Sequence, residues 1–541
     1  MKKFYLKIVA VMMCAALVFG ACAPSGSAGQ GTGTGSEATR ELRIGSFMAI
    51  QSLLPWRTTS DGDGYVLQQV YNTLLQMDEH SVFHGNLLES WEVADDNRTW
   101  TLHVREGMFW HRGNDLFGDE LVQVTAKDVE FSINFLLDPE NGAVRYAELS
   151  SSIESVEVLD EFTLRVVTQD IDVLFELRMS QTYVIPQRAF ETGWDLASHP
   201  IGSGPYKFYE YVVDSHVTLV RNDDFYITPG LDRVIIQIIP DRTVAAIALQ
   251  NQEIDIVMAI LPMDLAAVSA REFLSIEQFG VGIPRNVTFN AMNPLFQDYR
   301  MRRAISMAVD FESAAANIFA NEAGVELAFR LYGPISPERP GGDIDRFRAA
   351  APPFDPDRAI REIEALGWSR GPDGIFEKDG QRLSFTIQVG NNDANRETLA
   401  VIVSSQLRAI GIDAPVQSVE WATHLDDMTA GTLEVQIGGG WTGFDGPMMI
   451  MHSHPTRFSP NPGYANDQVD ALLQEAWRTL DLGARSEFLT QAAEIFIYEA
   501  AWMGGYLEYW QTAFNNRVTD FAGHASVFPP LTSHLRNVSV Q

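Results

Sequence analysis

Apolar residues recur along this chain with the period of a strand in some segments and the period of a helix in others. Residues 42–47 are typical of a strand, and residues 100–104 alternate between apolar and polar, as half-buried strands do. Residues 129–137 and 399–410 repeat apolar positions every three to four residues, which indicates helices with one buried face. Because both kinds of segment alternate over most of the chain, the pattern predicts several α/β lobes.

The same pattern places individual elements. Thr125 and Asp128 have the spacing of a capping box ahead of a helix. The apolar positions of residues 66–75 fall on one face of a helix, and this spacing predicts a single helix there. Residues 234–239 are apolar except for Gln237, so we expect a strand that is buried on both faces.

A glycine-rich run follows a predicted strand late in the chain. Residues 433–437 alternate as a strand does and lead into Gly438, Gly439 and Gly440, which precede Trp441. Ligands of open α/β sheets bind beyond the carboxyl ends of strands. Glycines at such an end let another backbone approach closely. We therefore expect a ligand site at this strand end.

The first residues have the order of a secretory signal. Lys2, Lys3 and Lys7 precede the apolar stretch 8–19, and small residues lead to Cys22. The apolar stretch is too short to span a bilayer as a helix. No later stretch of the sequence is long and apolar enough for a transmembrane helix, so we expect the remainder to be soluble.

Cys22 is the predicted lipidation site. Gly20 and Ala21 before it resemble a bacterial lipobox, in which the cysteine is acylated and becomes the new N-terminus. Phe19 stands where leucine is usual, so an ordinary cleaved signal that leaves Cys22 free remains the alternative. Residues 23–39 are rich in Gly, Ser and Thr, and such a flexible tether spans roughly 20–25 Å.

Composition and charge narrow the class of protein. The only two cysteines, Cys14 and Cys22, lie in the signal and at its end, so the mature chain could form no internal disulfide. Its core would be stabilised by apolar burial alone. The net charge of -32 argues against nucleic-acid binding, which needs clustered Lys and Arg. It also argues against adhesion to anionic lipid head groups.

Eight short segments in the same order resemble family 5 of the bacterial extracellular solute-binding proteins, the peptide- and nickel-type receptors of ABC importers. The segments are NLLESWEVADD at 86–96, WTLHVREG at 100–107, TAKDVEFS at 125–132, PIGSGPYKF at 200–208, NDDFY at 222–226, ALQNQEID at 248–255, the block from Asp298 to Asp310, and the stretch from Phe354 to Trp368. The resemblance extends from about Glu41 to Tyr509.

The resemblance implies an α/β fold of the periplasmic-binding-protein type II class. Two α/β lobes would close over the ligand about a hinge, with an additional domain inserted beside the first lobe. The implied bounds are 1–21 for the signal peptide, 22–40 for the lipid-anchored linker, 41–70, 200–289 and 504–541 for lobe I, 71–199 for the inserted domain, and 290–503 for lobe II.

The resemblance also implies the function. We expect a lipoprotein that captures a small ligand, an oligopeptide or dipeptide, and delivers it to the permease subunits of an ABC importer. It would be a monomer without cofactor, held outside the cytoplasm at the cell membrane by its lipid anchor. The same receptor role for an oligosaccharide or a metal chelate is the first alternative, and an extracytoplasmic hydrolase is a remote one.

The expected ligand-binding residues are Gly438, Gly439, Gly440, Trp441, Asp445 and Phe47. The glycines would let a peptide pair as an added strand, Trp441 would supply an apolar wall, and Asp445 would bind a free ammonium. By resemblance, peptide-binding members carry an acidic residue three positions after this Trp, where this chain has Phe444. A glycine bend with Trp441 in the core remains the alternative for the whole run. Phe47 and Tyr71 are alternatively core residues.

Other motifs in the sequence are weaker. Gly438, Gly440 and Gly443 fit the dinucleotide fingerprint, but no clear helix face follows them. His452 and His454 lie two apart beside a proline, where solvent exposure is more common than metal binding. The sequence holds no HExxH, Walker or GxSxG motif. We therefore predict no catalytic residue, no metal site and no enzymatic activity.

Overall fold

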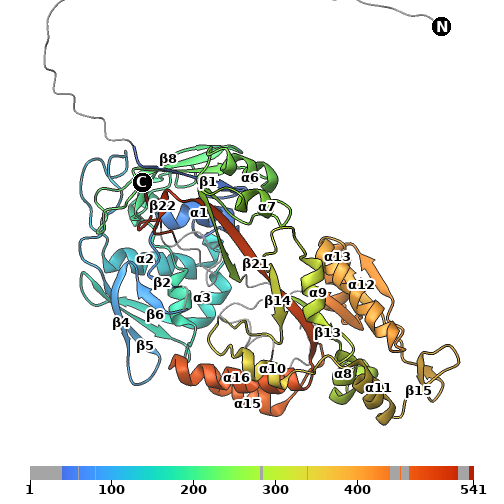
Figure 1. Cartoon of the computed structure of the whole chain (residues 1–541). Coiled ribbons are helices and arrows are strands. Elements are labelled where there is room, and N and C mark those ends of the chain that lie inside the picture. The colour runs from blue at the N-terminus through green and yellow to red at the C-terminus, as the bar shows by residue number, and fades with distance from the viewer. Residues whose placement is uncertain are drawn as a thin grey trace, which may run out of the picture. The chain divides into compact units, whose positions relative to one another are not determined.

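A mixed sheet of twelve strands organises the chain from Arg40 to Gln541 (Figure 1). The computed structural model describes residues 39–58, 60–78, 81–280, 284–337, 339–438, 451, 462–521 and 535–541. Ten strands follow in the order β19-β18-β20-β13-β21-β11-β1-β10-β9-β8, and β12 and β14 also pair with β21. Their bounds are β1 Glu41–Ser46, β8 Tyr206–Val212, β9 His216–Arg221, β10 Arg233–Ile238, β11 Ile256–Val257, β12 Leu274–Gly280, β13 Arg285–Phe289, β14 Ala328–Leu331, β18 Ile387–Gly390, β19 Val416–Val419, β20 Val435–Gly438 and β21 Trp502–Asn515.

The long strand β21 joins two α/β lobes. In lobe I, β1 lies parallel to both β10 and β11, and β11 pairs antiparallel with the last part of β21. In lobe II, β18 lies parallel to β19 and β20, while β13 connects β20 to the first part of β21. Strands β12 and β13 pair in succession along β21. The segment that leads from lobe I into lobe II through β12 and β13 therefore runs antiparallel beside β21, which leads back to lobe I. The predicted α/β fold with two lobes and a hinge is confirmed.

Helices cover both lobes. Those of lobe I are α1 Asp61–Val70, α6 Arg242–Gln250 and α7 Leu265–Ser269. Those of lobe II are α8 Tyr299–Ser306, α9 Phe311–Ile318, α10 Ile344–Ala350, α11 Pro356–Ala365, α12 Ala394–Ala409, α13 Trp421–Ala430, α15 Asp467–Ala476 and α16 Leu482–Tyr498. Apolar side chains from these helices and from the sheet form three buried clusters: one under lobe I, one that reaches from α6 and α7 of lobe I into lobe II, and one around α15 and α16.

An additional α/β region precedes the second strand of lobe I. Its four-stranded antiparallel sheet has the order β4-β5-β7-β6 and encloses its own apolar cluster. The strands are β4 Leu88–Val93, β5 Thr99–Val104, β6 Ile153–Val158 and β7 Thr163–Thr168, and the helices are α2 Ala126–Leu137, α3 Tyr146–Ser152, α4 Phe175–Ser180 and α5 Gln187–Thr192. The remaining short strands are β2 Leu75–Met77, β3 Phe83–Gly85, β15 Ser369–Arg370, β16 Phe376–Lys378, β17 Gln381–Arg382, β22 Val518–Thr519 and β23 Ser539–Val540.

The structure confirms one of the local predictions and corrects two others. Thr125 and Asp128 form the predicted capping box at the start of α2. The helix predicted over 66–75 begins earlier and ends at Val70, because the apolar residues that follow it enter the core in extended segments. The strand β10 is buried on alternate positions rather than on both faces, so the prediction for residues 234–239 was wrong in that respect.

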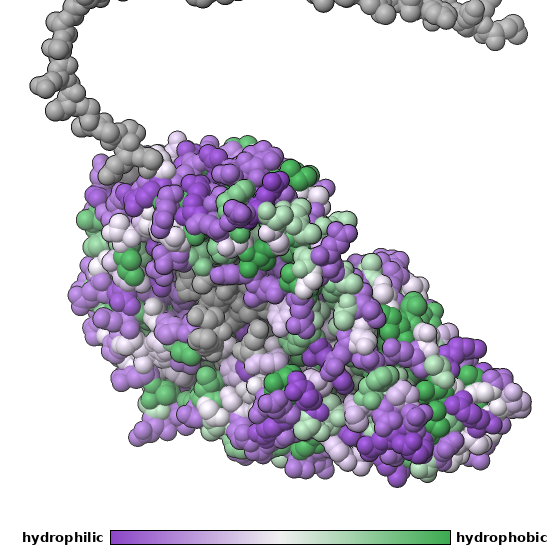
Figure 2. Space-filling model, viewed as in Figure 1, coloured by the Kyte–Doolittle hydropathy of each residue, from purple (hydrophilic) through white to green (hydrophobic). Residues whose placement is uncertain are grey.

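Polar side chains cover most of the face shown in Figure 2, in keeping with the strongly acidic composition. Across the described ranges, no helix is long and apolar enough to cross a membrane.

Candidate functional site

The carboxyl ends of the two lobes' parallel strands face each other across the middle of β21. In lobe II, Gly438 at the end of β20 lies opposite Asn286, which in turn pairs with Gly505. In lobe I, β11 ends beside Gln511, whose carbonyl accepts a hydrogen bond from the Ile260 amide at 2.9 Å. The strand ends thus lie on either side of residues 506–510, at the position where open α/β sheets bind ligands.

A cluster of charged side chains lies at the lobe II end of this site. The Arg285 guanidinium contacts Asp393 at 2.8 Å and Glu508 at 3.5 Å, and Arg396 lies 3.5 Å from the Asp393 carboxylate. Asp393 follows β18 and caps α12, since its other oxygen accepts the amides of Asn395 and Arg396. The helix start therefore fixes the carboxylate that positions both guanidinium groups.

Burial sets the electrostatics of this charged cluster. Burial raises the pKa of the Glu508 carboxyl, although Arg285 opposes that shift. Burial also lowers the pKa of Arg396, with a further contribution from the positive charge of Arg285. Two guanidinium groups and two carboxylates therefore share a poorly hydrated space, where an additional charged ligand group would interact strongly.

An aromatic pair extends the cluster into α13. The Arg396 guanidinium lies 5.0 Å from the ring centre of Trp421, which stacks on His424 with 5.4 Å between ring centres. His424 is 1% exposed, and neither of its ring nitrogens has a hydrogen-bond partner among the described residues. Burial, aided by Arg396, lowers the pKa of His424, so this imidazole is held neutral.

The lobe I end of the site is aromatic. Phe47 directly follows β1 and contacts Trp510 edge to face, with 6.2 Å between ring centres. The Arg242 guanidinium at the start of α6 lies 5.3 Å from the Phe47 ring centre. Burial lowers the pKa of Arg242, against the charges of Glu508 and Asp264. Because the Glu508 charge raises the pKa of Arg242 against the effect of burial, the two ends of the site are coupled electrostatically.

Two of the six predicted ligand-binding residues, Gly438 and Phe47, belong to the described residues. Gly438 and Phe47 lie at opposite ends of the site, and a methyl group added at Gly438 would meet no atom of the described residues within 4 Å. Tyr71 is 1% exposed within the lobe I cluster, so it is a core residue. The other residues singled out in the sequence lie outside the described residues: Cys22, Gly439, Gly440, Trp441, Phe444, Asp445, His452 and His454.

Sequence reasoning missed the charged cluster. Its members come from positions far apart in the chain: Arg285, Asp393, Arg396 and Glu508. One signal was present, because Asp393 follows a buried strand and begins a helix, as ligand-site residues of α/β lobes often do. Arg285 and Glu508 carry no comparable signal, since only the strand register brings them together.

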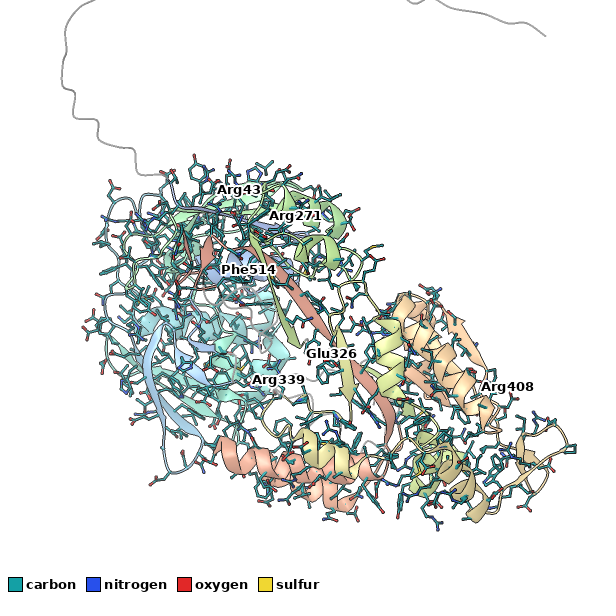
Figure 3. All side chains as sticks on the ribbon, viewed as in Figure 1. Arg43, Arg271, Glu326, Arg339, Arg408 and Phe514 are labelled. Carbon is teal, nitrogen blue, oxygen red and sulfur yellow. The ribbon has the colours of Figure 1, made fainter. Side chains whose placement is uncertain are left out.

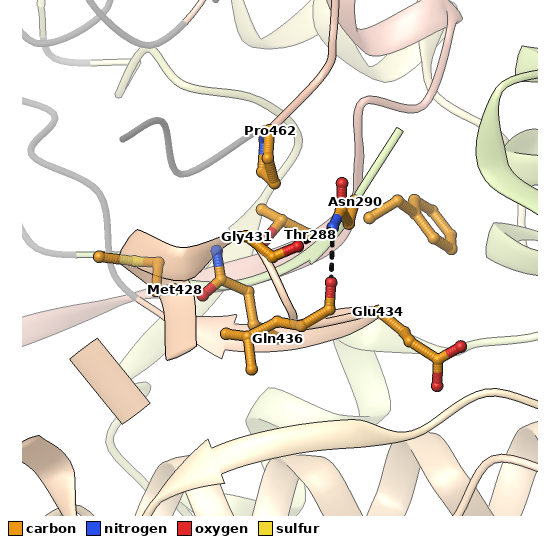
Figure 4. A pocket seen from close by; sticks show the side chains of 9 residues that line it. Thr288, Asn290, Met428, Gly431, Glu434, Gln436 and Pro462 are labelled. Atoms are coloured by element: carbon orange, nitrogen blue, oxygen red, sulfur yellow. Dashed lines mark hydrogen bonds between the residues drawn. The ribbon is translucent and has the colours of Figure 1, made fainter. Parts of the chain in front are cut away.

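A second cavity lies at the opposite end of β20 (Figure 4). Its volume is about 10 Å³, room for about one water molecule. Asn290 closes it by donating to the Leu433 carbonyl at 2.7 Å and to the Gly431 carbonyl at 3.2 Å. This space at the amino end of the strand is too small for a solute, so it is not the candidate site.

Metal-ligating groups do not gather elsewhere in the described part of the chain, where no group of three or more His, Cys, Asp or Glu side chains could hold an ion. The charged cluster itself combines two carboxylates with two arginines. Such a set suits an organic ion with charges of both signs better than a bare cation.

Comparison with known proteins shows which family the chain resembles. Residues 82–459 match the model of the bacterial extracellular solute-binding proteins, family 5. The oligopeptide-binding protein AppA of Bacillus subtilis is 25% identical over 88% of this chain and 88% of its own. The heme-binding protein A of Haemophilus influenzae is 26% identical over 92% of this chain and 93% of its own.

Solved structures share the fold. AppA in complex with a nonapeptide matches with a TM-score of 0.67 and 23% identity, over 93% of this chain and 99% of that one. NikZ of Campylobacter jejuni in complex with Ni(L-His) matches with a TM-score of 0.68 and 24% identity, over 92% of this chain and 99% of that one. In both cases the likeness extends over the two lobes and the additional domain.

Proposed function

Because the chain belongs to the bacterial extracellular solute-binding proteins of family 5, we propose that it is the peptide receptor of an ABC importer. It captures a dipeptide or oligopeptide between the two lobes and presents the closed complex to a permease. No bond of the ligand is made or broken. The relatives named above bind an oligopeptide, heme or a nickel chelate, so the ligand class is the part that needs support.

The charged cluster between the strand ends is the observation that carries the proposal. A peptide brings an ammonium and a carboxylate, together with main-chain amides. Arg285 and Arg396 offer partners to the carboxylate, and Glu508 offers one to the ammonium. Discrimination is expected to be strong, because a ligand that leaves a buried charge unpaired incurs a large penalty. Phe47 and Trp510 supply apolar walls for side chains.

The location follows from the N-terminal sequence. We propose export by the signal of residues 1–21 and acylation of Cys22, with residues 23–39 as the tether. The receptor is then held at the outer face of the cell membrane as a monomer, near the permease. Mass spectrometry of the exported protein is expected to detect a diacylglyceryl mass at Cys22, and a Cys22→Ser variant is expected to be released from the membrane.

Ligand screening tests the peptide assignment. The purified protein is mixed separately with a pool of dipeptides, a pool of random nonapeptides, heme, Ni(II)-histidine and a maltodextrin mixture. Thermal unfolding and native mass spectrometry report binding, since a ligand held only by the folded state raises Tm. We expect a peptide pool to raise Tm and to appear as a bound mass. A shift with heme, Ni(II)-histidine or maltodextrin and none with peptides contradicts the proposal.

Heme or a metal chelate is the second candidate. The sequence match to heme-binding protein A covers 92% of this chain at 26% identity, against 88% at 25% identity for the oligopeptide-binding protein AppA. The stacked pair Trp421 and His424 beside Arg396 would suit a flat anionic ligand. The charges of both signs around Glu508 favour the peptide.

A further inference from the structure

A groove with a volume of about 780 Å³ lies between α9 and β14. This volume is in the range of pockets that hold small organic ligands. Glu312, Ala315, Ala316 and Phe319 recur at helical spacing and form the wall on α9. Glu326, labelled in Figure 3, lines the groove where the chain enters β14.

The groove is separate from the charged cluster between the lobes. The Phe319 ring on its wall packs against Tyr506 with 5.3 Å between ring centres, and both residues are buried. Tyr509, which also lines the groove, points to the opposite face of β21 from Glu508, because neighbouring side chains of a strand alternate. The groove is therefore a second place for a ligand rather than an extension of the first.

The two ends of the groove differ in polarity. A short connection joins α9 to β14, so the end of the helix and the start of the strand lie together, where Phe319 and Leu327 are apolar. Glu312, at the start of α9, contacts Arg330 and Tyr332 at the other end. Glu312 and Phe319 are two helical turns apart, about 10 Å along the axis. This division suits a ligand with one charged end and an apolar body.

The Arg330 guanidinium carries a charge that its surroundings neutralise only weakly. Its side chain is 13% exposed. In the described part of the chain, the one carboxylate within 4 Å is that of Glu312, at 3.9 Å and on a side chain that is 66% exposed. Burial lowers the pKa of Arg330 despite the nearby charges of Glu312 and Asp310. A buried cation without a close counter-charge is costly, and an anionic ligand would reduce that cost.

A second guanidinium reaches the same end of the groove. Arg330 and Arg348 lie 4.5 Å and 5.8 Å from the ring centre of Tyr332, whose hydroxyl accepts from Arg348 Nε at 3.2 Å and donates to Glu312 at 3.1 Å. Planar guanidinium groups match carboxylates in two-point hydrogen bonds. The carboxylates at this end, Glu312 and Asp345, are mostly exposed, so water and salt weaken their repulsion of an anion.

We propose that this groove is a second ligand site, which takes a small organic acid with a carboxylate on an apolar body. The carboxylate binds the guanidinium groups of Arg330 and Arg348. The apolar body lies along α9 against Ala316 and Phe319. The site is independent of the peptide function proposed above, since the ligand of the groove does not contact the charged cluster.

Three probes separate the features of the ligand. These are 3-phenylpropionate, its uncharged counterpart 3-phenylpropionamide, and acetate, which keeps the carboxylate without the apolar body. Calorimetry and saturation-transfer NMR measure their binding to the full chain. We expect 3-phenylpropionate to bind about tenfold more tightly than the amide, because charge-assisted hydrogen bonds are lost in the amide. Acetate is expected to bind about tenfold more weakly as well, because it buries little apolar surface.

Variants assign the binding to the groove. Arg330→Gln is expected to weaken 3-phenylpropionate binding about tenfold and to leave binding of the amide unchanged, which a merely structural role would not produce. Ala316→Trp fills the groove from an exposed position of α9 and is expected to weaken both probes. It keeps the test available if Arg330→Gln lowers Tm. Asn317→Trp is the matched control, because this neighbouring exposed residue does not line the groove.

Several outcomes overturn the proposal. Equal affinity for the acid and the amide, or for the acid and acetate, contradicts the ligand class. Parental affinity in Ala316→Trp, or equal losses in Ala316→Trp and Asn317→Trp, contradicts the location. Loss of binding in Arg396→Gln but not in Arg330→Gln assigns the probe to the charged cluster. A parent that binds none of the probes has no such site. Ala316→Trp is expected to bind the peptide pools as the parent does, so failure of either proposal leaves the other intact.

Discussion

Glu508 is a carboxylate that the fold holds in a poorly hydrated position between two arginines. Burial raises its pKa in the folded state, so the folded protein retains a proton that the unfolded chain loses at lower pH. Its contribution to stability is therefore present below the unfolded pKa and is lost as the pH rises through the folded pKa. We expect Glu508→Gln to raise Tm relative to the parent above about pH 5, by a margin that grows toward neutrality.

The control for this measurement is Glu326→Gln, which neutralises an exposed carboxylate on the rim of the neighbouring groove. Its Tm is expected to follow that of the parent across the same pH series. Equal or lower stability of Glu508→Gln at every pH would mean that the ion pair with Arg285 outweighs the burial of Glu508.

His111 makes a pH-dependent contact between the additional domain and the start of lobe I strand β8. Its Nε2 donates to the Gly204 carbonyl at 2.9 Å, and the Gly202 amide donates to Nδ1 at 3.4 Å, so the neutral ring fits. Burial lowers the pKa of His111 from 6.5 to about 4. Stability is thus lost as the pH falls from 6.5 toward 4, by about 3 kcal/mol in total.

A His111→Gln variant, which keeps a donor and an acceptor without a titrating ring, is expected to have a flatter Tm profile between pH 6.5 and 4. The exposed His84 provides the control, because His84→Gln removes a ring whose contact with Asp78 lies at the surface. A parent profile that is already flat over this interval contradicts the assignment.

At the scale of elements, Gly438 and Gly202 show two different uses of glycine. A methyl group at Gly202 would lie 2.0 Å from the Val70 carbonyl oxygen, whereas one at Gly438 would meet nothing within 4 Å in the described part of the chain. Gly202→Ala is expected to destabilise the protein by several kcal/mol through backbone overlap. Gly438→Ala is expected to leave Tm unchanged and to weaken peptide binding about fivefold, because the ligand main chain is kept away from β20.

Thermal unfolding and calorimetry with the nonapeptide pool measure both effects on the same preparations. Gly438→Ala with parental peptide affinity would show that no ligand backbone approaches the end of β20.

The elements that the sequence predicts well are those with local signals. The capping box of Thr125 and Asp128 needs only four residues to be recognised, and Gly438 could be selected because it ends an alternating strand. Arg285 and Glu508 could not, since their contact depends on the register of β13 against β21, more than 200 positions apart in the chain. The helix over 66–75 was overextended because apolar spacing does not mark where the chain leaves a helix for the core.

At the scale of the whole molecule, β21 is not the only link between lobe II and the rest of the chain. Val173 and Leu174, just before α4 of the additional domain, are buried in the same apolar cluster as Leu489 and Phe496 of α16. Arg485 of α16 is 3% exposed and donates to the Val173 carbonyl at 3.1 Å. Any opening of the lobes about β21 must either carry this contact along or break it.

We expect this contact to break on opening and therefore to favour the closed form. Leu174→Ala removes apolar surface that is buried only while the contact exists, at a cost of roughly 2–4 kcal/mol. Small-angle scattering of the unliganded variant should give a larger radius of gyration than the parent, and a saturating peptide pool should restore the parental value. Leu136→Ala, buried inside the additional domain, should lower Tm without changing the radius. A Leu174→Ala protein that is destabilised yet keeps the parental radius would show that the additional domain and α16 move together, so that closure depends on β12, β13 and β21 alone.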